Sequence, residues 1–119
     1  KRLSHGTKQK IAIIASLVND PLLWVLDEPM TGLDVEAVRV LKELIRSRAD
    51  CGKSVLFSSH ILEICENLCD KIVIMQAGTI KKTIELRGNP SDTSLEDIYM
   101  EVVNDVPMEK GFSIKQNNK

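Results

Sequence analysis

The sequence of 119 residues predicts an α/β fold, in which helices flank a parallel sheet and a small antiparallel edge hairpin follows near the end. Two continuous apolar runs, at 22–26 and 54–58, are typical of strands buried on both faces of a parallel sheet. The segments around them show the 3.6-residue apolar period of helices. Because strands and helices alternate with short connections, right-handed parallel units are expected.

The first helix is expected to follow Ser4, whose hydroxyl suits a helix cap, and to end before Pro21. Its apolar stripe consists of Ile11, Ile14, Ala15 and Val18. The buried strand at 22–26 comes next. A second helix is expected to begin after Asp34 and to close near Gly52, with a stripe made of Val38, Leu41, Leu44 and Ile45.

The rest of the chain predicts one further parallel unit and then a hairpin. The expected elements are a strand at 54–58, a helix at 60–69, a third parallel strand at 71–76, a returning antiparallel strand at 80–86 and a final helix from Ser94 to about Asn104. The last helix opens on a capping-box pattern, Ser94-Leu95-Glu96-Asp97. We expect one domain at 1–104 and a polar, disordered tail at 105–119.

Composition narrows the classes of function. The net charge is −1 and the aromatic residues number four, which argues against nucleic acid as a partner. The longest nearly apolar run, Ile11 to Val18, is far too short to span a bilayer. Cys65 and Cys69 share a helix face and supply half of a zinc site, whereas reduced core thiols are the simpler interpretation for them and for Cys51.

Polar residues follow both buried strands. The first strand ends in Asp27 and Glu28, and the second in Ser58, Ser59 and His60. Because the carboxyl ends of parallel strands share one edge of a sheet, these side chains are expected to meet, although any strand must exit into polar residues. Such a pair of carboxylates suits phosphoryl transfer, one holding Mg²⁺ and the other activating water, while His60 stabilises the phosphate.

A second candidate site lies at the start of the first helix. A serine hydroxyl at Ser4 and unpaired backbone N–H groups form an anion site, with Gly6 permitting close approach. Taken alone, the same segment is equally well explained as an ordinary helix cap.

These motifs together resemble the nucleotide-binding domain of ABC-transporter ATPases. The resemblance rests on the order and spacing of a signature segment, a Walker B strand with its glutamate, a D-loop and a switch histidine: Leu3-Ser4-His5-Gly6-Thr7, Leu22 to Glu28, Gly32-Leu33-Asp34 and His60. It implies a P-loop NTPase-like fold, ATP and Mg²⁺. The residues it assigns are Glu28 and His60 for catalysis, Asp27 for the metal, and Ser4, Gly6 and Asp34 for binding the nucleotide or the domain interface.

The signature departs from the family pattern, which usually reads Leu-Ser-Gly-Gly-Gln. Here His5 replaces the first glycine and Thr7 the glutamine, while Ser4 and Gly6 are retained. Ala15 stands where many importers have arginine. With the terminal helix, these features resemble the export branch of the family.

The printed sequence has no G-x-x-x-x-G-K-[ST] segment, the Walker A motif with which the family holds phosphates. Gly52-Lys53-Ser54 imitates its end, but Ser47 stands where the first glycine belongs, and the tripeptide follows a helix and precedes a strand. We therefore expect a helix cap and turn there. The chain is interpreted as the carboxyl-terminal half of a nucleotide-binding domain, inactive without a Walker A segment.

The resemblance also implies partners and a location. It implies a second nucleotide-binding domain, on whose ATP Ser4 and Gly6 would act, and membrane-embedded permease subunits that hold a cytoplasmic protein at the membrane. Two alternatives stay open: a non-transport ABC ATPase of DNA repair or translation, which commonly has insertions not seen here, and a non-catalytic interaction module.

Overall fold

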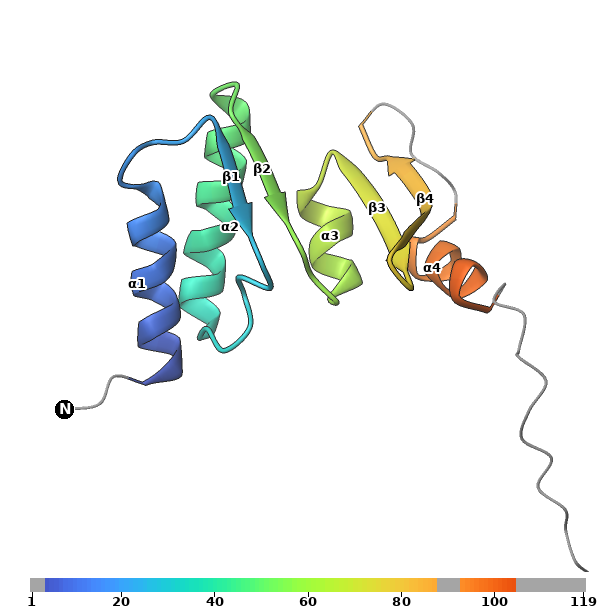
Figure 1. Ribbon diagram of the computed structural model, residues 1–119, viewed down its shortest axis with the longest axis horizontal. Helices are drawn as coiled ribbons and strands as arrows, with labels where there is room; N and C mark the ends of the chain where they lie inside the picture. The colour runs from blue at the N-terminus through green and yellow to red at the C-terminus, as the bar shows by residue number, and fades with distance from the viewer. Residues whose placement is uncertain (1–3, 88–92, 105–119) are drawn as a thin grey trace, which may run out of the picture. The chain divides into compact units, whose positions relative to one another are not determined.

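The chain divides at Cys69 and Asp70 into two compact units (Figure 1), and the computed structural model describes residues 4–87 and 93–104. The first unit contains α1 (His5–Leu17), β1 (Leu23–Leu26), α2 (Val35–Asp50), β2 (Ser54–Phe57) and α3 (Leu62–Leu68). The second contains β3 (Lys71–Gln76), β4 (Thr79–Glu85) and α4 (Leu95–Asn104). The predicted tail at 105–119 lies outside the described residues.

The first unit is built on a parallel pair of strands. β1 and β2 run side by side in the same direction, from Leu23 opposite Ser54 to Leu26 opposite Phe57, with α2 as the connection between them. The predicted helix caps are present: the Ser4 hydroxyl accepts a hydrogen bond from the Thr7 amide at the start of α1. The predicted parallel α/β arrangement is confirmed here.

The core of the first unit lies between the strands and the helices. Its buried residues are Trp24, Leu26, Met30, Leu41 and Ile45, and side chains from α1, α2 and α3 pack against them. The Trp24 indole N–H donates to the Ser16 hydroxyl at 2.8 Å, so the one polar atom of the ring is satisfied. The Arg48 guanidinium lies 5.7 Å from the centre of the same ring and joins the end of α2 to this core.

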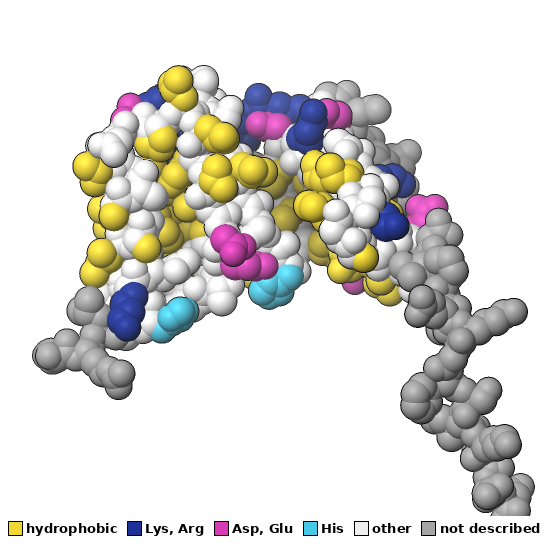
Figure 2. Space-filling view, in the orientation of Figure 1, with side chains coloured by type: hydrophobic (Ala, Val, Ile, Leu, Met, Phe, Trp, Pro, Cys, Tyr) yellow, Lys and Arg dark blue, Asp and Glu magenta, His cyan; other side chains and the backbone are white. Residues whose placement is uncertain are grey.

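The prediction that these strands are buried on both faces is wrong for the described chain. Trp24 and Leu26 are buried, whereas Leu23 is 54% exposed, Val25 61% and Leu56 61%. The reason is that the helices of this unit pack on the face to which Trp24 points, so alternate residues lie on an uncovered face. Figure 2 shows hydrophobic side chains gathered over this part of the surface.

The second unit is a hairpin followed by a helix. β3 pairs with β4 antiparallel, with Gln76 opposite Thr79, which confirms the predicted hairpin. Among the described strands β3 pairs with β4 alone, so no parallel partner of the expected strand at 71–76 is seen. The two turn residues, Ala77 and Gly78, have φ of 49° and 73°, the left-handed geometry of a tight hairpin turn. This turn brings the returning strand β4 directly beside β3.

The helices follow the predicted bounds with small shifts, but the stripe predicted for the buried face of α1 is wrong. Ile11 is 51% exposed, Ile14 66% and Val18 77%, and Ile13 and Leu17 pack against the core instead. α4 buries Leu95 and Ile98, and the Asp97 amide donates to the Ser94 hydroxyl, as the capping box predicted. α3 begins two residues later than predicted, since the Ser59 hydroxyl accepts a hydrogen bond from the Ile61 amide and holds a turn before the helix. Among the described residues, none of the helices is long and apolar enough to cross a membrane.

Candidate active site

The predicted acidic pair and the end of the second strand meet at one edge of the parallel sheet. β1 ends at Leu26, so Asp27 and Glu28 follow it directly, and Ser58 follows β2. The Ser58 amide donates to the Leu26 carbonyl at 3.0 Å, which continues the ladder past the last paired residues. The parallel register therefore sets the two chain exits beside one another, as the sequence predicted.

The Ser58 hydroxyl connects the two acidic residues. It accepts a hydrogen bond from the Glu28 amide at 2.8 Å and donates one to Asp27 Oδ1. One side chain from β2 thus fixes both the Asp27 carboxylate and the Glu28 backbone. The sequence placed Ser58 at this edge but assigned it no role. The signal that could have found it is its register, one residue beyond the Phe57 partner of Leu26.

Glu28 and His60 form the second contact of the site. Glu28 Oε1 lies 3.0 Å from His60 Nδ1, and the side chains are 38% and 73% exposed. Glu28 has a φ of 43°, an unfavourable left-handed backbone for a residue with a side chain, held in place by the bond from its amide to Ser58. This turn places the Glu28 side chain at the edge of the sheet, where it is partly exposed and accessible to water.

The oxygen donors at this edge fit Mg²⁺. Asp27 offers a carboxylate that is already oriented by Ser58, and magnesium is usually held by one or two carboxylates together with waters and phosphates. Across residues 4–87 and 93–104, no group of three or more His, Cys, Asp or Glu side chains could hold a metal ion.

The residues predicted to bind nucleotide at the start of α1 lie beside the segment that precedes α2. A Cβ on Gly6 would stand 2.8 Å from the Gly32 carbonyl oxygen, so the two glycines allow this close approach. Asp34 caps α2 by accepting from the Ala37 amide, as predicted, and pairs with Lys10 of α1 at 2.6 Å. These bonds, that from Lys10 first, lower the pKa of Asp34.

Gly52-Lys53-Ser54 forms the helix-to-strand turn that the sequence predicted. Gly52 has a φ of 80° just after α2, and β2 begins at Ser54. The Lys53 ammonium pairs with Asp20, which Arg48 also contacts, and these two partners lower the pKa of Asp20, the bond from Lys53 being the largest cause. Lys53 thus forms a structural ion pair that joins the turn between α2 and β2 to the connection between α1 and β1.

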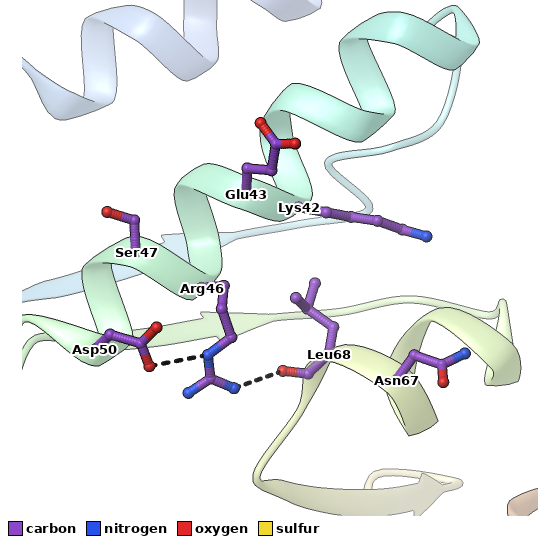
Figure 3. Close-up of a pocket in the computed structure, with 7 residues that line it drawn as sticks. All are labelled: Lys42, Glu43, Arg46, Ser47, Asp50, Asn67 and Leu68. Atoms are coloured by element: carbon purple, nitrogen blue, oxygen red, sulfur yellow. Dashed lines mark hydrogen bonds and ion pairs between the residues drawn. The ribbon is translucent and has the colours of Figure 1, made fainter.

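A separate hollow of about 490 Å³ lies against the C-terminal half of α2 (Figure 3). It contains none of the predicted site residues; its lining consists of Lys42, Glu43, Arg46, Ser47, Asp50, Asn67 and Leu68. Arg46 crosses it, donating to Asp50 at 3.2 Å and to the Leu68 carbonyl at 3.4 Å. The arginine therefore holds the end of α3 against α2.

Comparison with known proteins agrees with the fold. No family model matches the chain. Nod factor export ATP-binding protein I of Rhizobium leguminosarum bv. viciae is 37% identical over 118 residues, which cover 97% of this chain and 37% of that protein. The uncharacterized ABC transporter ATP-binding protein YdbJ of Bacillus subtilis is 34% identical over 120 residues, covering 100% of this chain and 37% of that protein.

Solved structures give the same result. The structure of an ATP-binding subunit of an ABC transporter superposes with a TM-score of 0.76 at 33% identity, covering 86% of this chain and 45% of the other. A dimeric, post-hydrolysis ATP-binding cassette bound to ADP and Pi gives a TM-score of 0.67 at 26% identity, covering 73% and 38%.

The fold is that of part of a P-loop NTPase-like α/β domain, like the solved ATP-binding subunits of ABC transporters. More narrowly, the chain belongs to the ATP-binding proteins of ABC transporters. Its similarity to Nod factor export proteins agrees with the predicted resemblance to the export branch. The chain spans little more than a third of the length of the curated relatives it matches.

Proposed function

We propose that this chain is part of an ATPase domain that binds and hydrolyses ATP with Mg²⁺ to power transport across a membrane. The observation that carries the proposal is the linked set at the sheet edge, in which Ser58 bonds to Asp27 and Glu28, and Glu28 bonds to His60. The relatives' names as ABC transporter ATP-binding proteins support it.

The residues of the chain divide the chemistry between them. When bound, Mg²⁺ and ATP supply the neutralising charge and the phosphoryl group. Asp27 would hold the metal, and Glu28 would take a proton from the attacking water, a role suited to a carboxylate open to solvent. The contact of His60 Nδ1 with Glu28 Oε1 keeps the glutamate oriented, and His60 would help to stabilise the negative charge that develops on the phosphate.

Assembly with further chains is part of the same proposal. Ser4 and Gly6 lie at the start of α1, where backbone N–H groups suit a phosphate, and would act on the nucleotide of a second nucleotide-binding domain. Asp34, close by as the cap of α2, would lie at that interface. Permease subunits in the membrane would hold this protein on the cytoplasmic side. The dimeric cassette among the structural neighbours supports such a pairing.

A reconstitution experiment tests the proposal. The 119-residue chain would be mixed with a separately made amino-terminal half that contains a G-x-x-x-x-G-K-[ST] segment, and phosphate release would be followed. We expect no turnover from the chain alone and ATP turnover from the mixture. The matched controls are Glu28→Gln, which should abolish that turnover, and Glu43→Gln, the same change at an exposed ion pair on α2, which should preserve it.

Two results would contradict the proposal: hydrolysis by the chain alone, or equal turnover with Glu28→Gln. A third, complex formation without turnover, would favour the alternative of a non-catalytic interaction module. The uncovered face formed by Leu23, Val25 and Leu56 is the observation behind that alternative, since exposed apolar patches mark interaction sites.

A further inference from the structure

α3 contains two cysteines that ATP hydrolysis does not use. Cys65 lies in the helix and Cys69 is its C-cap; neither is in a disulfide, and both are partly exposed. Their side chains are hydrogen-bonded to each other, and Cys65 also bonds to Ser59 in the turn before α3. Cys51, the third cysteine, lies outside α3, at the C-cap of α2, and is exposed.

The backbone lets the two sulfurs approach further. Residues four apart on a helix have Cβ atoms about 5–6 Å apart, whereas a disulfide needs about 3.5–4.5 Å. Cys69 has already left the helix, with φ −87° and ψ 149°, although its amide still bonds to the Cys65 carbonyl at 3.0 Å. A residue outside the helix can shift toward Cys65 without breaking the ladder of α3.

The surroundings also favour reaction at Cys65. The bond from Cys69, followed by that from Ser59, lowers the pKa of the Cys65 thiol to about 7, against the opposing effects of partial burial and the Glu28 charge. A lowered pKa increases the fraction of this thiol that is thiolate at neutral pH, and the thiolate is the nucleophile. In the described chain no three-ligand metal group exists that would occupy the pair instead.

We propose that Cys65 and Cys69 form a reactive dithiol that a hydroperoxide converts reversibly to an intrachain disulfide. The Cys65 thiolate attacks the O–O bond of hydrogen peroxide, forming a sulfenic acid and releasing hydroxide, which takes up a proton to become water. The Cys69 thiol then attacks the Cys65 sulfur, the S–S bond forms and a second water leaves. The two thiols lose two electrons and two protons, and one peroxide is reduced to two waters.

The position of the pair gives this chemistry a target. Cys65 contacts Ser59, which lies between Ser58 and His60 of the candidate active site. Oxidation of Cys65 would therefore alter its contact with Ser59, in the turn that positions the Ser58 and His60 side chains. The dithiol itself does not rest on the proposed ATPase function, and the test below measures the thiols alone.

The sequence allows a sharp test by tryptic mapping. Trypsin places Cys65 and Cys69 in one peptide, 54–71, and Cys51 in another, 49–53. The folded 119-residue chain would be treated with hydrogen peroxide in the presence of a chelator, then alkylated with iodoacetamide and digested. We expect peptide 54–71 to lose the mass of two hydrogen atoms and to take up no alkyl group, while Cys51 is alkylated. Dithiothreitol should restore both alkylation sites.

Single serine variants supply the controls. Cys51→Ser should leave the mass loss unchanged, and Cys65→Ser or Cys69→Ser should each abolish it, with circular dichroism confirming that the helices persist. The proposal is overturned if both cysteines of the peptide remain alkylated after peroxide. It is also overturned if Cys69 is alkylated beside an over-oxidised Cys65, or if the disulfide joins two chains or includes Cys51.

Discussion

Replacing Ser58 by alanine is expected to slow catalysis without weakening ATP binding. The change removes the donor to Asp27 and the acceptor for the Glu28 amide. A hydrogen bond to a charged group contributes about 1.5–3 kcal/mol and a neutral one about 0.5–1.5 kcal/mol. Because this edge is open to solvent, water replaces part of both bonds, and the activation barrier should rise by about 1–2 kcal/mol. This corresponds to a roughly 5- to 30-fold lower kcat.

The assay is steady-state ATP hydrolysis by an intact ATPase in which this chain is joined to a Walker A-containing half. Ser58→Ala should lower kcat with little change in KM for ATP, and Ser58→Thr, which keeps the hydroxyl, should recover most of the rate. Ser47→Ala, the same change on α2, is the control and should behave as the parent. An unchanged kcat for Ser58→Ala, or a failure of Ser58→Thr to recover it, would refute the bridging role.

Two further substitutions, each made in the same intact ATPase, distinguish the candidate site from the Gly52-Lys53-Ser54 turn that resembles the end of a Walker A motif. His60→Ala should lower kcat, by roughly tenfold or more, with little effect on ATP affinity, because the imidazole bonds to Glu28; turnover equal to the parent would exclude its role. Lys53→Ala should leave ATP affinity and turnover unchanged, because the Lys53 ammonium pairs with Asp20 at a turn. ATP affinity would be measured by filter binding or calorimetric titration. A loss of affinity above about tenfold, ~1.4 kcal/mol, would show that Lys53 binds phosphate.

The sequence could predict the edge of the sheet at which the candidate active site lies, because apolar runs end where strands end. Asp27 and Glu28 directly follow one run, and Ser58 and His60 follow the other, so parallel pairing alone brings them together. The role of Ser58 was beyond such reasoning. It depends on which rotamer the hydroxyl adopts and on the left-handed backbone of Glu28, neither of which an apolar pattern encodes.

The errors in the predicted fold have similar causes. An apolar run shows that a segment can be buried, but not which surface covers it, so the exposure of Leu23 and Val25 did not follow from the pattern. An apolar run also does not specify its pairing partner: the run at 71–76 was expected to pair in parallel as well, and among the described strands it pairs with β4 alone. The close contact of Gly6 with Gly32 likewise joins segments far apart in sequence.

If Glu28 is the base of an ATPase site, Glu28→Gln should stop the cleavage of bound ATP, which a single-turnover experiment measures. The amide keeps the size of the side chain and an oxygen that can bond to His60, but it cannot accept a proton from water. With ATP prebound to the intact ATPase and the reaction quenched in acid, we predict cleavage about 10²- to 10⁴-fold slower than in the parent, with ATP retained uncleaved. Cleavage of bound ATP within about threefold of the parent rate, a difference of only ~0.7 kcal/mol in the barrier, would contradict the account.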